Sequence, residues 1–570
     1  METIRHNVQF CVIGGGLAGM CAALAAARHG VKTLIMQERP MFGGNASSEV
    51  RMWVCGARYD RESGLVEELR LENLYRNTYP IYSVWDSILY EKIRFQDNLD
   101  FLLNCTCQDV VMDGSRIVSV KGWQMTTQQY HVVEADYFAD CSGDSILAPL
   151  TGAEFRWGRE AKAEFGESLA QDVPDGKTMG MSCILQVRET DSPKKFIPPA
   201  WASKFPDDDS FPKRDHTMEH TQNFWWLELG GEGNSIADTE TVRDQLLKDA
   251  YGLWDHIKNH GDHAADNWIL DWVGILPGKR ESRRMIGDYL LNQNDVLNNT
   301  KFDDIVAFGG WPVDDHHPGG FQYFGPPNIN ILPKQSYGIP LRCLYSKNIA
   351  NLLFAGRNIS ATHTGISSTR VMATCALLGQ AVGTAVFHAV AAGGLSPRET
   401  AQKCIHAIQQ TLLDDDCWLL GIKRNVPQLT LNAALTVSNG DGEPLRNGYD
   451  RPYNGQDNAW LCANGDSVSY DFGAPTPLSR IRLVFDSDFS RCPLNMVSNY
   501  YKQQAVFEPP ATLVKAYHIE ADGKEVFRDD DNHQRLIFIP LDITAKSVKL
   551  VIDAVRTPDA PTKVFAFDVR

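Results

Sequence analysis

The sequence contains no C-x-x-C pair and no Cys/His spacing typical of a zinc site, although 13 of its 570 residues are cysteine. Compact iron–sulfur motifs are therefore disfavoured, and the spacing gives no reason to expect a bound metal. An odd number of cysteines without a framework pattern fits a reducing compartment, so we expect a cytoplasmic protein.

Positive charge and long apolar runs are also scarce. The 55 Lys and Arg residues stand against 71 Asp and Glu, a net charge of −16, and no basic run suggests a nucleic-acid groove. The run Phe10 to Ala27 is uncharged and superficially resembles a signal peptide, but glycines at fixed offsets interrupt it. We interpret this run as part of the fold, and we expect neither a membrane-spanning helix nor a membrane partner.

The N-terminal segment predicts a βαβ unit. An apolar strand over Val8–Ile13 is followed by a glycine turn, an Ala-rich helix ending near His29, and a second strand over Val31–Gln37. The turn fits G-x-G-x-x-G, which is typical of dinucleotide sites when it joins a strand to a helix. A glycine turn in an ordinary α/β protein is the alternative, and this context disfavours it.

Each glycine of the turn has a physical role. Gly14 allows the tight turn, Gly16 lets the backbone approach the pyrophosphate, and Gly19 lets helix and strand pack. The helix then begins with Leu17 and Ala18, and its N-terminus would face the negative charge. Glu38, nineteen residues after Gly19, can accept hydrogen bonds from ribose hydroxyls and would repel a 2′-phosphate, so NADP is disfavoured.

Three further motifs separate FAD from NAD. A second glycine turn directly follows Glu38, a Ser-Gly-Asp segment follows later, and an Ala-Gly-Arg segment precedes a small-residue helix that we expect over Ser368–Ala392. These motifs resemble flavoproteins of the glutathione-reductase-like superfamily. The resemblance adds these cofactor residues: Arg39, Gly43, Gly44, Asn45, Gly143, Asp144, Gly356, Arg357 and Ser368.

Residues 6 to 390 resemble the FAD-dependent oxidoreductase family common in polysaccharide-degrading bacteria. The motifs that carry the resemblance include Gly44–Trp53, Gly278–Arg284 and Gly309–Asp314. The resemblance implies FAD and oxidoreductase activity. No histidine lies between His29 and His131, so we expect the FAD to be non-covalent. The sequence has no second G-x-G-x-x-G, so the electron acceptor is left open as an external one.

The catalytic candidates are histidines and arginines expected near the flavin. His316 and His317 lie in a Gly/Pro-rich loop, where a neutral imidazole could remove a hydroxyl proton; solvated loop histidines are the equally weighted alternative. His363 is a similar candidate with an equally plausible supporting role. Arg51 could hold a carboxylate or an oxyanion, as could Arg280, Arg283 and Arg357, although structural ion pairing is at least as probable for each.

Other conspicuous residues favour structural interpretations. Trp225 and Trp226 could form a platform for a sugar ring, but we slightly favour burial in the core. Cys55 stands alone after the second glycine turn, which argues against a dithiol relay. The acidic runs Asp207–Asp209 and Asp414–Asp416 are interpreted as solvated loop or helix-end charges.

Beyond about Leu429 the pattern changes to short alternating strands, for example Ser467–Phe472, Ile481–Phe485 and Val548–Ile552. This part resembles the galactose-binding-like, or discoidin-like, jelly-roll family. We therefore expect an α/β protein: a Rossmann-type FAD-binding core with an inserted α+β substrate domain, followed by a C-terminal β-sandwich (jelly roll). The expected ranges are 1–154 for the first part of the core, 155–330 for the insertion, 331–428 for the returning part and helices, and 429–570 for the sandwich.

The leading functional hypothesis is hydride transfer between flavin N5 and a hydroxylated small molecule, a sugar or an oligosaccharide-derived substrate. Flavin-assisted, redox-neutral cleavage of a glycosidic bond is a variant, since a transient ketone acidifies the neighbouring C–H bond. A glycan-binding or partner-binding protein with structural FAD is the rival. The sequence leaves the oligomeric state open, with a homo-oligomer as one option.

Overall fold

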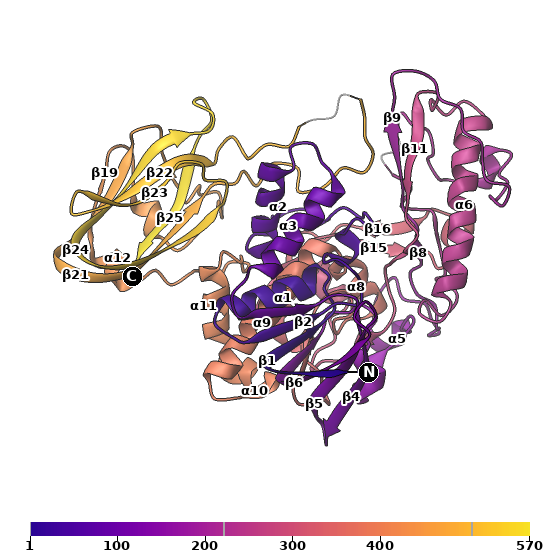
Figure 1. Cartoon of the computed structure of the whole chain (residues 1–570), viewed down its shortest axis with the longest axis horizontal. Helices are drawn as coiled ribbons and strands as arrows, with labels where there is room; N and C mark the ends of the chain where they lie inside the picture. Colours follow the sequence, from indigo (N-terminus) through magenta and orange to yellow (C-terminus); the bar gives the residue numbers. More distant parts are fainter. Residues whose placement is uncertain (1, 221–222, 503–505) are drawn as a thin grey trace. The chain divides into compact units, whose positions relative to one another are not determined.

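The structure is a computed structural model of the chain that describes residues 2–220, 223–502 and 506–570 (Figure 1). Its contacts divide the chain into two compact units. The first contains Met1–Glu62, Pro80–Ile408 and Leu494–Ala505, and the second contains Ser63–Tyr79, Gln409–Pro493 and Val506–Arg570. This division differs from a single boundary near residue 429. Residues 63–79 and 409–428 precede that boundary but belong to the second unit, and residues 494–505 follow it but belong to the first.

A largely parallel sheet forms the centre of the first unit (Figure 1). Its order is β3-β2-β1-β6-β5-β4, with β18 also paired to β6. The strands are β1 (Thr3–Ile13), β2 (Thr33–Met36), β3 (Leu99–Leu102), β4 (Cys105–Asp113), β5 (Arg116–Gln124), β6 (Gln129–Asp140) and β18 (Leu352–Phe354). Strands β1, β2, β3, β6 and β18 run parallel, whereas β4 and β5 form an antiparallel extension. The expected βαβ unit is present.

Two small-residue helices pack closely in this unit. They are α1 (Leu17–Arg28) and α9 (Met372–Ala391). A Cβ at Gly379 would lie 1.9 Å from the Ala18 carbonyl oxygen, and one at Gly383 would lie 2.2 Å from that of Ala22. Glycine therefore lets the two backbones meet.

The helix expected over Ser368–Ala392 is two helices, α8 (His363–Thr369) and α9. The break occurs because Val371 is extended, with φ −67° and ψ 144°. Within the described residues, α9 is the one helix that is long and apolar enough to cross a membrane, and 83% of its most apolar window is buried inside the fold. Burial of this kind is typical of the core helix of a folded domain.

The region expected as an insertion mixes short strands and helices. Five small antiparallel sheets pair β10-β8-β12, β11-β9, β13-β7, β14-β17 and β15-β16. The strands are β7 (Phe155–Arg156), β8 (Met181–Ser182), β9 (Leu185–Glu189), β10 (Glu228–Leu229), β11 (Trp268–Val273), β12 (Gly278–Lys279), β13 (Arg284–Met285), β14 (Ile305–Gly309), β15 (Val313–His316), β16 (Asn328–Ile331) and β17 (Tyr337–Pro340). The long helix α6 (Thr239–Asn259) buries Trp254 against Trp226 and Trp268.

The remaining elements of the first unit are short. They are η1 (Gly44–Ala46), α3 (Tyr82–Arg94), α4 (Leu147–Thr151), α5 (Lys162–Phe165), η2 (Asp208–Ser210), α7 (Gln293–Asn298), η3 (Gly320–Gln322), η4 (Leu341–Cys343) and α10 (Pro397–Lys403). Helix α11 (Ile405–Asp414) continues into the second unit. A capping box of Ser396 and Glu399 begins α10.

A segment from the C-terminal part of the sequence belongs to the first unit. The Asn495 side-chain oxygen accepts a hydrogen bond from the buried Val54 amide at 2.8 Å. The Gln186 side-chain amide donates to the carbonyls of Val497 and Ser498 at 3.4 and 3.2 Å. These contacts satisfy polar groups that would otherwise be buried without partners, so this segment is structurally part of the first unit.

The second unit is an antiparallel β domain with the order β20-β25-β21-β24-β22-β23 and β19 paired to β21 (Figure 1). Its elements are α2 (Leu65–Arg76), α12 (Gln428–Asn432), β19 (Ala434–Val437), η5 (Glu443–Arg446), β20 (Trp460–Leu461), β21 (Ser467–Phe485), β22 (Val514–Ala521), β23 (Lys524–Asp529), β24 (Leu536–Val555) and β25 (Lys563–Val569). The strands expected over Ser467–Phe472 and Ile481–Phe485 are the two ends of β21, joined through register shifts.

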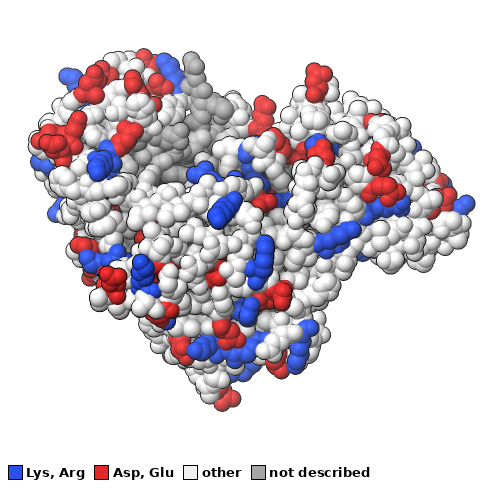
Figure 2. Space-filling model, turned by 180° about the vertical axis from the view of Figure 1, so that it is seen from behind, with Lys and Arg blue, Asp and Glu red and all other residues white. Residues whose placement is uncertain are grey.

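Buried ion pairs also hold the second unit together. Arg535 binds Asp416 at 2.8 Å, and Arg424 binds Asp568 at 2.7 Å. Asp414 binds Arg480 at 3.0 Å. The expectation of solvated loop or helix-end charges is wrong for Asp416, which is buried against Arg535. Asp414 is a helix-end charge, at the last residue of α11, and it is ion-paired with an arginine that is distant in sequence. On the face drawn in Figure 2, by contrast, side chains of both signs are interspersed.

Candidate functional site

The glycine turn between β1 and α1 makes close backbone contacts on one side and lines a cavity on the other. Gly14 has φ +104°, and a Cβ there would lie 2.4 Å from the Cys141 carbonyl oxygen. The Gly15 amide donates to the Gln37 side chain at 2.8 Å. No side chain caps α1 at Gly16, so the first amides of the helix are available to an anion.

The second glycine turn packs directly on the first. The Gly43 amide donates to the Gly15 carbonyl at 2.8 Å, and Gly43 and Gly44 have φ +105° and +57°. A Cβ on Gly44 would lie 3.0 Å from the Gly16 Cα. A side chain at Gly44 would therefore push the two turns apart.

A third segment, residues 141–144 after β6, lines the same cavity as the two glycine turns, and we call these three segments the cofactor cradle. Gly143 has φ +80°, and a Cβ there would lie 2.5 Å from the Arg357 guanidinium. Asp144 accepts hydrogen bonds from Arg357 and Lys279, both at 2.7 Å. Burial alone would raise the pKa of Asp144, but these two cations hold it at about 2. Asp144 is therefore a fixed anion that anchors Arg357.

These segments line one cavity of about 600 Å³. Of the residues that sequence analysis assigned to the cofactor, Gly14, Gly16, Leu17, Ala18, Glu38, Arg39, Gly43, Gly44, Asn45, Gly143, Asp144, Gly356 and Arg357 line it. Gly19 lies behind the turn, where a Cβ would meet the Gly14 carbonyl oxygen. Ser368 is not a lining residue, and its hydroxyl is hydrogen-bonded to Tyr337 at 2.6 Å. Instead, Arg370, Val371 and Met372 at the start of α9 line the cavity.

His316 lines the same cavity, at the end of β15. Its Nδ1 lies 3.0 Å from both oxygens of Glu228, and its Nε2 lies 3.3 Å from Asp314. The ring of Trp225, another lining residue, meets the imidazole edge to face at 5.1 Å. The structure thus gives His316 two carboxylate partners and one aromatic partner.

Two arginines offset the two carboxylates around His316. Arg280 binds Glu228 at 2.8 Å, and Arg370 binds Asp314 at 3.1 Å. Burial would raise the pKa of Glu228, but Arg280 and His316 lower it below its usual range. Two guanidinium groups thus face the two carboxylates around the imidazole.

The other histidine candidates lie outside the cavity lining. The ring of His317 stacks on Tyr323 at 3.5 Å, and its Nδ1 accepts the Gly319 amide at 3.1 Å. His363 is buried between Glu281 at 2.8 Å and Asp315 at 2.9 Å. Burial opposes protonation, but the two carboxylates raise the pKa of His363 to about 10. A histidine that is cationic at pH 7 has no lone pair with which to accept a proton, so the geometry favours a supporting role.

The arginine candidates fall into two groups. Arg280, Arg283 and Arg357 line the cavity. Arg51 does not: it donates to Gln186 at 2.9 Å, and its guanidinium lies over the Trp272 ring at 4.3 Å. Arg51 is thus held by an aromatic ring and an amide, and it is not a lining residue of the cavity.

Sequence reasoning missed Glu228, Asp314, Arg370 and Asn328 as parts of this site. Asn328 and Asp314 are hydrogen-bonded to each other across β15 and β16. The one available signal was Glu228, a single carboxylate within the apolar stretch 224–229. The neighbours Trp225 and Trp226 separate, because Trp225 lines the cavity whereas Trp226 is buried in the core.

Cys55 also lines the cavity, and its chemistry is that of an inert thiol. Burial raises the pKa of Cys55 to about 12, so no thiolate forms at neutral pH. All 13 cysteines lie in the described part of the chain and none forms a disulfide.

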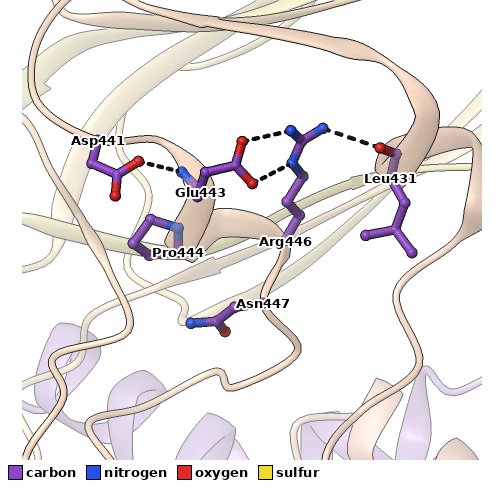
Figure 3. Close-up of a pocket in the computed structure, with 6 residues that line it drawn as sticks. All are labelled: Leu431, Asp441, Glu443, Pro444, Arg446 and Asn447. Carbon is purple, nitrogen blue, oxygen red and sulfur yellow. Dashed lines mark hydrogen bonds and ion pairs between the residues drawn. The ribbon is translucent and has the colours of Figure 1, made fainter.

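The second unit has a more open hollow of about 410 Å³ (Figure 3). It is lined by Leu431, Asp441, Glu443, Pro444, Arg446 and Asn447. Figure 3 shows that the Arg446 guanidinium and the Glu443 carboxylate are paired with each other, with distances of 3.0 and 2.6 Å. The Asp441 carboxylate accepts the Glu443 amide at 3.0 Å, so the polar groups of this hollow bind mainly to one another.

Comparison with known protein families gives one decisive match. The family model for "FAD dependent oxidoreductase" matches residues 9–412. The chain belongs to the FAD dependent oxidoreductase family. It is an FAD-dependent oxidoreductase, and FAD is its cofactor. The uncapped start of α1 and the two apposed glycine turns fit the pyrophosphate of this cofactor.

Other comparisons are distant. No curated protein sequence matches this one significantly. A geranylgeranyl bacteriochlorophyll reductase-like protein from Thermoplasma acidophilum is 13% identical, covering 72% of this chain and 86% of its own, with a TM-score of 0.32. The glycerol-3-phosphate dehydrogenase of Bacillus halodurans in complex with FAD is 15% identical, covering 32% and 40%, with a TM-score of 0.21. Chitosan-binding module 2 of a Paenibacillus sp. IK-5 chitosanase/glucanase is 16% identical, covering 25% and 98%, with a TM-score of 0.18.

Proposed function

We propose that this oxidoreductase oxidises a hydroxyl group of a sugar or glycan-derived substrate, and that His316 removes the hydroxyl proton. The observation that carries the proposal is that His316 and its carboxylate partners line the same cavity as the FAD cradle. The FAD is held without a covalent bond.

Glu228 fixes the tautomer of His316 in this proposal, because its carboxylate can only accept and therefore holds the proton on Nδ1. The substrate hydroxyl takes the place of Asp314, 3.3 Å from Nε2, so that the Nε2 lone pair meets the hydroxyl proton. Once Nε2 has taken a proton, the imidazolium can donate to Glu228 and to Asp314. This is the role that a carboxylate has behind a histidine base in other enzymes.

The overall step balances with two electrons and two hydrogens. When bound, FAD supplies an acceptor for a hydride from the carbon that bears the hydroxyl group. The hydroxyl proton passes to His316, and a C=O bond forms as the C–H and O–H bonds break. Arg280, held at the cavity wall by Glu228 and by the Trp225 carbonyl at 2.9 Å, can donate to a second oxygen of the substrate.

A carbohydrate substrate is supported by two features. Trp225 presents an aromatic ring to the cavity beside His316, and sugar rings stack on such surfaces. The antiparallel β domain carries the sequence features of galactose-binding-like jelly rolls, and we propose that it binds glycan.

Anaerobic mixing with a panel of mono- and oligosaccharides tests the proposal. We expect one class of sugar to bleach the oxidised flavin and to yield a keto-sugar. If the sugar is instead cleaved without an electron acceptor and without net flavin reduction, the redox-neutral variant replaces simple oxidation. If no hydroxylated compound reduces the flavin or is converted, while the flavin remains reducible by dithionite, the proposal fails.

A further inference from the structure

We propose that Asp208, His216, His256 and His263 form a structural Zn²⁺ site in the first unit. These four residues each offer one ligand atom, and the atoms all lie within 4.8 Å of one another. The site does not overlap the FAD cavity, whose lining contains none of the four. It therefore goes beyond the redox function.

The spacing of the ligand atoms matches a tetrahedral zinc ion. Zinc–nitrogen distances of about 2.0–2.1 Å place neighbouring ligand atoms about 3.3–3.4 Å apart. The Nε2 atoms of His216 and His256 are 3.2 Å apart. Asp208 Oδ1 lies 3.5, 3.1 and 3.6 Å from the Nε2 atoms of His216, His256 and His263. Four of the six edges of the tetrahedron thus have nearly the required length.

The hydrogen bonds behind the rings leave their lone pairs facing inward. His216 Nδ1 lies 2.7 Å from the Arg214 carbonyl, and His256 Nδ1 lies 2.9 Å from the Phe205 carbonyl. A carbonyl can only accept, so each Nδ1 carries the proton, and the Nε2 of the neutral ring carries a lone pair. Two such lone pairs at 3.2 Å repel each other unless a cation lies between them.

A proton shared between His216 and His256 explains the short distance between their Nε2 atoms less well than a metal ion does. The His256 side chain is 0% exposed, so a charge shared at its Nε2 is screened little by solvent. A single proton could also bridge only one pair of ligand atoms, whereas a dication accepts all four. His263 Nε2 lies 3.3 Å from the His260 carbonyl, so this nitrogen must give up that contact and its proton to bind the ion. The backbone carbonyls behind His216 and His256 are the outer partners that orient metal-bound histidines.

Four protein ligands leave no open position, which is typical of a structural rather than a catalytic zinc. The ion would join η2, the loop at His216 and the C-terminal turn of α6. Arg214, next to this loop, donates to the carbonyls of Gly320 and Tyr323 at 3.0 and 3.2 Å. The zinc site would thereby stabilise the part of the chain that follows His316.

The sequence did not predict this site, because the intervals from Asp208 to His216, to His256 and to His263 resemble no short zinc motif. The loop and the long helix α6 bring together residues that the sequence keeps far apart. The sequence analysis expected no metal, and this proposal differs from that expectation. The Asp208 side chain is solvated as expected, at 73% exposed.

Metal content of the purified full-length protein tests the proposal without any assay of activity. We expect about one zinc per chain by mass spectrometry, and X-ray absorption with four N/O ligands at about 2.0–2.1 Å. Removal of zinc by a chelator should lower the Tm, and added Zn²⁺ should restore it. Asp208→Ala and His256→Gln should each weaken zinc affinity by about 100-fold or more, because one of four ligands is lost.

Asp208→Ala keeps the test decisive if His256→Gln does not fold, because the Asp208 side chain is 73% exposed and contributes little packing. His260→Ala is the matched control: it lies between His256 and His263, is 43% exposed and is not one of the ligands. It should keep its zinc. Equal zinc binding by wild type and Asp208→Ala, or no binding by the folded wild type in excess Zn²⁺, would overturn the proposal. Preferential retention of another metal by these residues would overturn the assignment to zinc.

Discussion

His316 and His363 both lie between two carboxylates, yet their surroundings give them different chemistry. His316 borders the FAD cavity, and its partners Glu228 and Asp314 are each paired with an arginine. His363 lies outside the cavity lining, buried between Glu281 and Asp315, which raise its pKa to about 10 despite the burial. Glu281 beside His363 is likewise paired with an arginine, Arg284, at 3.2 Å, so the arginine behind a carboxylate does not distinguish the two histidines. The comparison teaches that flanking carboxylates do not define a base, and that access to the cavity does.

The largest effect is expected for replacement of His316. His316→Ala should leave FAD binding and folding intact while slowing flavin reduction by roughly two to four orders of magnitude, since a positioned proton acceptor is lost. His317→Ala is the matched control, because His317 stacks on Tyr323 outside the cavity lining and should reduce flavin at nearly the wild-type rate. Anaerobic stopped-flow with a reactive sugar measures both. Equal rates in the two variants would remove the distinction between these neighbours.

The next effect concerns the stability that His363 provides. Its pKa is raised from 6.5 to about 10 in the folded protein, so the stabilisation is fully present below pH 6.5 and is lost as the pH rises through about 10. His363→Gln should therefore be less stable than wild type at pH 6, by on the order of 3 kcal/mol, and the difference should shrink towards pH 10. Denaturant unfolding with constant excess FAD gives the free energies. A difference that does not change with pH would mean that His363 is neutral in the fold.

Sequence reasoning succeeded where the structure depends on neighbouring residues. The β1-α1-β2 unit follows from an apolar strand, glycines at fixed offsets and an Ala-rich helix, all within about forty residues. The partners of His316 could not be inferred in this way, because Glu228 is 88 residues away and is brought close by the fold. For the same reason, the membership of Leu494–Ala505 in the first unit was not predictable from a change in strand pattern.

The smallest expected effect is for Glu38 in the cofactor cradle, whose role differs from the roles of both histidines. Glu38 lines the cavity directly after the strand that follows α1, and it is placed to accept hydrogen bonds from the ribose. Loss of charge-assisted hydrogen bonds worth roughly 1.5–3 kcal/mol corresponds to about ten- to hundredfold in affinity. Glu38→Ala should therefore raise the Kd for FAD by this factor, measured by titration of the apoprotein, while the saturated variant reduces its flavin at nearly the wild-type rate. This pattern would be the reverse of that for His316→Ala, and it would separate cofactor binding from proton transfer. An unchanged Kd would place Glu38 outside the FAD contacts, and a large loss of rate at saturating FAD would mean that the two roles are not separate.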